Sequence, residues 1–254
     1  MRGFTCIAAT VVCLMSFAVP AGAASEAQLD RLLAARDWKT LDDAVYPFKD
    51  PSAVRADLAW LGKKVDGGEG GFYLAGMYGM HLSLGMMNLD PQGFLSSAGA
   101  KNKPEDPDKN LQVASAMYGL YAIGLTVVDG AACSSASPIH YWLSKNRAPA
   151  DLRGGMTFLR TFSAAGKASI VDRVVKLEAR TASLRGDDET LCKGGVDEPA
   201  SPGDAFEAVV IAGQQRTNAA PAAGADIFLP PDEAAKARER ARAHLRETLT
   251  KLLQ

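Results

Sequence analysis

Histidine and cysteine are scarce in this chain of 254 residues, which has three histidines and four cysteines. His81, His140 and His244 lie in three separate segments, so no closely spaced pair is available to begin a zinc site. The Gly-x-Ser-x-Gly nucleophile motif and the glycine-rich phosphate-binding motifs are absent as well. A formal net charge of -1 gives no general attraction to nucleic acid or anionic lipid. The sequence therefore offers no motif-based reason to predict an enzyme, and we predict no cofactor and no nucleic-acid partner.

The first 23 residues have the pattern of a secretory signal peptide. Arg2 is their only charge, an apolar run extends from Phe4 to Val19, and Pro20 is followed by the small residues Ala21-Gly22-Ala23. A basic start, a short apolar stretch and small residues before the cut are what signal peptidase requires. We expect cleavage near Ala23 and a periplasmic or secreted protein; an uncleaved N-terminal anchor is the alternative.

Two cysteines, Cys133 and Cys192, remain after the signal peptide. In an oxidising compartment a single pair most simply forms a disulfide. The bridge would close a loop of roughly 60 residues, and the chain-entropy model assigns such a bridge about 4 kcal/mol of stabilisation. Two separate buried thiols are the alternative.

The rest of the chain shows helical periodicity and helix-capping signals. Ser25 begins a capping box, and Asp50-Pro51 is a helix start signal. Apolar residues then recur every three to four positions, and no alternating strand pattern is found. We predict an all-α fold, a compact multi-helix array that antiparallel helical hairpins would satisfy. The expected helices are 26–36, 38–45, 51–66, 71–89, 110–128, 150–165, 167–184 and 232–253.

Two of these helices, 71–89 and 110–128, contain no charged residue. Met77-Tyr78-Gly79 in the first is echoed by Met117-Tyr118-Gly119 in the second, which allows a helical-hairpin repeat. Both segments contain tyrosines and other polar residues, and several glycines suit close helix–helix contact. We therefore favour buried core helices over a transmembrane hairpin.

The sequence divides into four parts by composition. Residues 1–23 form the signal peptide, and residues 24–217 form a helical domain. Residues 218–231 are rich in Ala, Pro and Gly and are interpreted as a linker. Residues 232–254 form an amphipathic C-terminal helix with interleaved acids and bases, which is typical of a solvated face.

One group of residues is chemically specific: Met77, Met80 and His81 share a face of the 71–89 helix. Thioether and imidazole ligands suit Cu(I), which an exported protein can encounter outside the reducing cytosol. Methionines at helical spacing also fill core gaps, so packing is the competing interpretation.

Three classes of function follow from these observations. The first is a non-enzymatic binding or interaction module of the bacterial envelope with a protein partner, because helical arrays often present concave binding faces. The second is periplasmic Cu(I) handling through Met77, Met80 and His81. The third is a hydrolase assembled from distant acids, which are Asp42, Glu69, Asp129 and Asp151.

Overall fold

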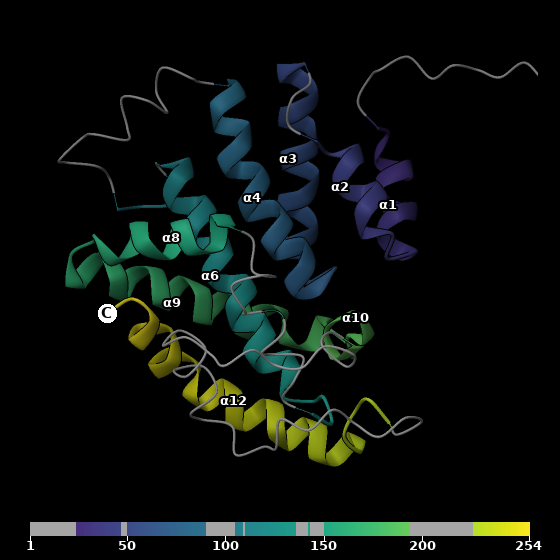
Figure 1. Ribbon diagram of the computed structural model, residues 1–254, viewed down its shortest axis with the longest axis vertical. Coiled ribbons are helices and arrows are strands. Elements are labelled where there is room, and N and C mark those ends of the chain that lie inside the picture. Colours follow the sequence, from purple (N-terminus) through teal and green to yellow (C-terminus); the bar gives the residue numbers. More distant parts are fainter. Residues whose placement is uncertain are drawn as a thin grey trace, which may run out of the picture.

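The computed structural model describes residues 24–46, 50–89, 105–108, 110–135, 142, 150–193 and 226–254. Within these ranges the chain is helical, and the only strand-like pairing is an isolated bridge between Cys133 and Phe228. The predicted all-α class is thus confirmed (Figure 1). The predicted signal peptide and residues 218–225 of the predicted linker lie outside the described residues.

Helices α1 (Glu26–Ala34) and α2 (Trp38–Ala44) form the N-terminal corner of the molecule. The side chain of Ser25 caps α1 by accepting a hydrogen bond from the backbone of Gln28. The helix predicted over 26–36 ends two residues early, since Arg36 has a φ of 52° and cannot continue it. The backbone N–H of Asp37 closes this end on Leu32, as in a Schellman motif.

Helix α3 (Pro51–Asp66) runs beside α4 (Gly71–Leu89). Asp50 caps α3 and Pro51 occupies its first turn, as the sequence predicted. The connection between the two helices is a glycine-rich turn in which Gly68, Gly70 and Gly71 all have positive φ. L-residues with a side chain rarely adopt this conformation, so the turn depends on glycine.

Helices α4 and α6 (Leu111–Gly130) cross as an antiparallel pair at the repeated Met-Tyr-Gly segments. A Cβ placed on Gly79 would lie 3.0 Å from the backbone oxygen of Ser115 and 3.1 Å from the nitrogen of Gly119. The rings of Tyr78 and Tyr118 pack edge to face, 4.5 Å apart. The two copies of the motif therefore meet each other, and their glycines let the backbones approach closely.

Helix α6 is the centre of the fold. It packs against α4, α8 (Ala150–Arg160), α9 (Ala164–Thr181) and α12 (Pro231–Leu252), and nearly all of its side chains are buried. By length and hydropathy α6 is the one described helix that could cross a membrane. Most of it is covered by other helices, which agrees with the predicted core position.

The helix predicted over 167–184 differs from the structure at both ends. Ser163 caps α9, so the helix starts at Ala164, and α8 ends at Arg160 rather than at 165. Beyond Thr181 the chain tightens into a 3-10 turn, η1 (Ala182–Leu184). The tighter winding removes Leu184 from the predicted apolar seam, and this residue is 61% exposed.

The short helix α10 (Glu189–Lys193) is joined to the end of α6 by the disulfide between Cys133 and Cys192, whose Cα atoms are 5.3 Å apart. This pairing confirms the predicted disulfide. The last part of the predicted linker, residues 226–229, lies extended along residues 132–134 through two backbone hydrogen bonds. Helix α12 then begins at Pro231 and packs on α6 and α9.

Candidate functional site

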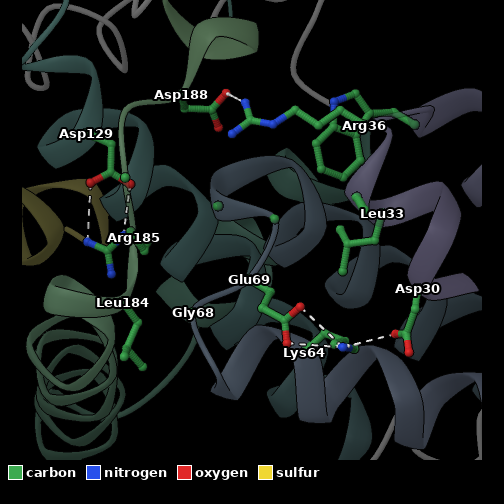
Figure 2. A pocket seen from close by; sticks show the side chains of 15 residues that line it. Asp30, Leu33, Arg36, Lys64, Gly68, Glu69, Asp129, Leu184, Arg185 and Asp188 are labelled. Carbon is green, nitrogen blue, oxygen red and sulfur yellow. Dashed lines mark hydrogen bonds and ion pairs between the residues drawn. The ribbon is translucent and has the colours of Figure 1, made fainter.

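A polar cavity of about 570 Å³ lies where α1, the α3–α4 turn, the end of α6 and the segment before α10 meet (Figure 2). This volume is within the range of small-molecule binding sites. Its lining contains four carboxylates and three cations, alongside glycines and a few apolar side chains. The charged lining residues are Asp30, Arg36, Lys64, Glu69, Asp129, Arg185 and Asp188.

The glycine-rich turn provides one wall of the cavity as bare backbone. A Cβ on Gly70 would lie 2.5 Å from the Cβ of Leu74, and a Cβ on Gly71 would lie 3.0 Å from Oδ2 of Asp188. Side chains are therefore excluded from both positions by contact as well as by their positive φ. The lack of side chains here keeps the space in front of Asp188 open.

At one end of the cavity Lys64 bridges two carboxylates. Its Nζ lies 3.0 Å from Oδ1 of Asp30 and 3.1 Å from Oε1 of Glu69. Hydrogen bonds from Lys64 and from the indole of Trp60 lower the pKa of Asp30. The hydrogen bond to Asp30 in turn raises the pKa of Lys64, so the cluster is held in its charged form.

At the other end of the cavity Arg36 donates from Nη1 to Oδ1 of Asp188 over 3.0 Å. Arg36 occupies the left-handed position that ends α1, where glycine is the usual residue. An arginine there carries a conformational cost on the order of 1 kcal/mol. Its side chain donates a hydrogen bond to Asp188, and, after the hydrogen bond from Lys193, its charge also helps to lower the pKa of Glu189.

The third charged group is a buried network behind the cavity wall. Arg185 donates from Nε to Asp129 over 3.0 Å and from Nη2 to Glu178 over 2.7 Å. The exposed fractions of these three side chains are only 4%, 8% and 0%. Arg242 of α12 also donates to Glu178, over 2.9 Å. Burial raises the pKa of Asp129, while Arg185 opposes that shift and favours the carboxylate.

The three cations of the cavity differ in how many of their hydrogen-bond donors have partners. All three nitrogens of the Arg185 guanidinium donate hydrogen bonds, and Lys64 contacts two carboxylates. Arg36 is 47% exposed and, within the described part of the chain, bonds through Nη1 alone. Beside it, Oδ2 of Asp188 accepts no hydrogen bond from a described residue. The cavity thus combines a saturated buried network with one ion pair in which the arginine is accessible and the carboxylate is only 11% exposed.

The residues proposed for Cu(I) lie on α4, away from this cavity. Met77 and His81 are buried and Met80 is half-buried. Nε2 of His81 lies 2.7 Å from Oδ1 of Asp42 on α2, and Nδ1 has no hydrogen-bond partner among the described residues. No group of three His, Cys, Asp or Glu side chains in the described ranges could hold a metal ion, and the thioethers of Met77 and Met80 are ligands of a different class. The copper hypothesis stays a prediction.

Two of the four acids suggested for a hydrolase, Glu69 and Asp129, line the same cavity. Asp42 contacts His81 instead, and the side chain of Asp151 lies outside the description. Sequence reasoning missed the basic residues of the site, because nothing local marks Arg36 or Arg185 as a cavity residue. The doubled glycines after α3 were a usable signal, since such a turn marks a close approach of the backbone.

No protein-family model, no curated protein and no solved structure is significantly similar to this chain. The interpretation of the cavity therefore rests on its own geometry.

Proposed function

We propose that this chain is an exported, non-enzymatic binding protein of the bacterial envelope that takes a small polar ligand into the cavity between α1, the α3–α4 turn and residues 184–188. The observation that carries the proposal is the Arg36–Asp188 pair, with its half-exposed arginine, in a cavity large enough for a metabolite. Concave sites with a few oriented polar groups are the usual form of small-molecule sites.

The disulfide supports the exported location. Bridges such as Cys133–Cys192 persist in oxidising compartments and are uncommon in the cytosol. The signal-peptide pattern of residues 1–23 points the same way. The predicted protein partner stays a prediction beside the small-ligand proposal.

The character of the lining favours recognition over catalysis. Its charged groups are already matched with one another, and such matched pairs orient a polar ligand. Leu33, Ala34 and Leu184 add apolar surface next to the charges. A ligand with polar ends and some aliphatic surface would match both the charged and the apolar parts of the lining.

The test uses saturation-transfer NMR on the purified, disulfide-bonded chain with defined probes: glucose, citrate, putrescine and the dipeptide leucyl-leucine. We expect at least one probe to bind the wild type and to lose binding in Gly186→Trp. Gly186 lines the cavity, and a Cβ there meets nothing within 4 Å, so the indole has room to occupy the opening.

The matched control is Gly154→Trp on α8. Gly154 also has open space around a Cβ and does not line the cavity, so this variant should bind like the wild type. Equal probe signals in the wild type and in Gly186→Trp, or no signal from any probe, would contradict the proposal.

Cu(I) handling is kept as a second candidate function because of one observation, the unpartnered Nδ1 of buried His81. A buried ring nitrogen without a hydrogen bond is costly, and a metal ion is one way to satisfy it. Titration with Cu(I) against a competing chelator tests this candidate. A variant with alanine at Met77, Met80 and His81 should lose the metal, and unchanged binding would eliminate the idea.

A further inference from the structure

We propose that the ligand of this cavity is a small aliphatic zwitterion, a dipeptide with free ends, held by its carboxylate at Arg36 and by its ammonium group at Asp188. This inference rests on the proposed function and specifies its ligand class.

The first step is the unused hydrogen-bonding capacity of one ion pair. Among the described residues Arg36 bonds through Nη1 only, so Nε and Nη2 remain as donors there. Asp188 uses Oδ1 to accept from Arg36 and from the backbone of Leu191, and its Oδ2 accepts from none of the described residues. One donor edge and one acceptor oxygen therefore lie side by side at the cavity wall (Figure 2).

The second step is that a ligand with a single charge fits this pair poorly. An anion at Arg36 would be repelled by the carboxylate of Asp188, and a cation at Asp188 would be repelled by the guanidinium of Arg36. A zwitterion places the opposite charge beside each group, and complementary charges on both sides of a contact give specificity. The adjacent pair therefore selects a molecule that carries both charges.

The third step is that the other end of the cavity holds a second cluster of mixed charge, across the open space from Arg36. It consists of Lys64, Asp30 and Glu69. The carboxylate Oδ2 of Asp30 has no hydrogen-bond partner among the described residues. The cavity of about 570 Å³ thus has room, between the two clusters, for the side chains of a dipeptide whose two ends both stay at the Arg36–Asp188 pair.

The fourth step is the apolar surface at the opening. Leu184 lines the cavity and is 61% exposed, which makes it one of the few large apolar side chains left in water among the described residues. Leu33 and Ala34 of α1 line the cavity as well. Aliphatic side chains on the ligand would cover Leu184 and remove apolar surface from water.

The experiment is isothermal titration calorimetry of the full disulfide-bonded chain with three probes. Leucyl-leucine carries both charges, N-acetyl-leucyl-leucine lacks the ammonium group, and leucyl-leucine amide lacks the carboxylate. We expect leucyl-leucine to bind and each blocked form to bind at least about tenfold more weakly, because each loses a charge-assisted hydrogen bond. Equal affinity for all three probes would overturn the inference.

The variant that tests the residue is Arg36→Gly. Glycine suits the φ of 52° at this position, which offsets part of the cost of leaving Asp188 without its cation, so the chain should stay folded while the affinity for leucyl-leucine falls at least about tenfold. Arg36→Lys keeps the positive charge and should retain part of the affinity. Arg240→Ala removes an exposed positive charge from α12, outside the cavity, and should change nothing. Unchanged affinity in Arg36→Gly would also overturn the inference.

The outcome separates this inference from the function on which it rests. Suppose that leucyl-leucine does not bind, while glucose, citrate or putrescine binds the wild type and not Gly186→Trp. The zwitterion proposal is then wrong and the proposed binding function stands. If no probe binds, both are wrong.

Discussion

Replacing Arg185 by methionine should be the most destabilising single change in the buried network. The substitution leaves Asp129 and Glu178 without their shared guanidinium, and both carboxylates are almost completely buried. Removing one partner of a buried ion pair costs about 3–5 kcal/mol. For a chain of this size that loss corresponds to a melting temperature lower by roughly 6–20 °C.

The assay is urea unfolding of the disulfide-bonded chain, followed by circular dichroism at pH 7. Arg180→Met is the matched control. Arg180 pairs with Asp66 at 3.3 Å, and the two side chains are 61% and 50% exposed. Such surface pairs contribute at most about 1 kcal/mol. A loss in Arg185→Met no larger than that of Arg180→Met would refute the view that the network is dry and mutually dependent.

The same variant makes a prediction about pH. Burial raises the pKa of Asp129 and Arg185 is what holds it down, so without Arg185 the pKa rises further. A group with a raised folded-state pKa binds protons more tightly when folded, so lowering the pH favours the folded form. The loss in Arg185→Met should therefore be smaller at pH 5 than at pH 8. The reverse order would contradict the argument.

Three further predictions concern the helix crossing, the disulfide and the acid limb of stability. Gly79→Ala should cost about 1–3 kcal/mol in urea unfolding, because its Cβ would meet the backbone of α6. Gly76→Ala, with its nearest contact at 3.7 Å, should instead gain about 0.5–1 kcal/mol; equal effects would show that the crossing is not tight. Alanine at both Cys133 and Cys192 should lower the unfolding free energy by about 4 kcal/mol and abolish any response to dithiothreitol. Asp30→Asn should flatten the loss of stability in acid. Because the pKa of Asp30 is lowered in the folded chain, this carboxylate stabilises the fold at pH values above its ordinary pKa of 3.8. That stabilisation is lost as the pH falls through the folded-state pKa. An unchanged melting curve between pH 2 and 5 would refute the last of these.

Local signals were enough to predict the longer helices, but not the short α10 (Glu189–Lys193). Ser25 and Asp50 cap helices through their side chains, as their sequence context predicted. Asn110, placed inside the predicted 110–128 helix, caps α6 instead. The lack of charge correctly predicted a buried helix at 110–128, because an unpaired charge is costly in a core. The 71–89 helix is buried along one side and leaves Met87 exposed. The predicted end of the 167–184 helix was wrong, because no residue near Leu184 signals the change to a 3-10 turn.

The Met-Tyr-Gly echo had a meaning that spacing alone did not give. The structure places Tyr78 on Tyr118 and Gly79 against Gly119, so the shared motif is a self-complementary contact. Such a contact needs the same small and aromatic residues from both helices, whether or not the segments descend from one repeat.

The cavity was harder to predict because its ion pairs join distant parts of the chain. Arg36 and Asp188 are 152 residues apart, and Arg185 and Asp129 are 56 apart. Charge patterns within a helix turn cannot reveal such pairs. A long-range pairing becomes visible only when the fold has brought α1, the end of α6 and the segment after η1 together.

The wall formed by residues 184–188 has little regular structure, so its position depends on the attachments at its two ends. At one end Arg185 is tied to Asp129 at the end of α6. At the other, Asp188 accepts from the backbone of Leu191 at the start of α10, and Cys192 joins α10 to Cys133, just after the same helix. Two unrelated interactions, one ionic and one covalent, thus fix this segment to the end of α6. Since a binding site loses affinity whenever it must first be ordered, these attachments keep Asp188 beside Arg36 before any ligand arrives. In the proposed binding function the disulfide would contribute to recognition as well as to stability, although neither sulfur lines the cavity.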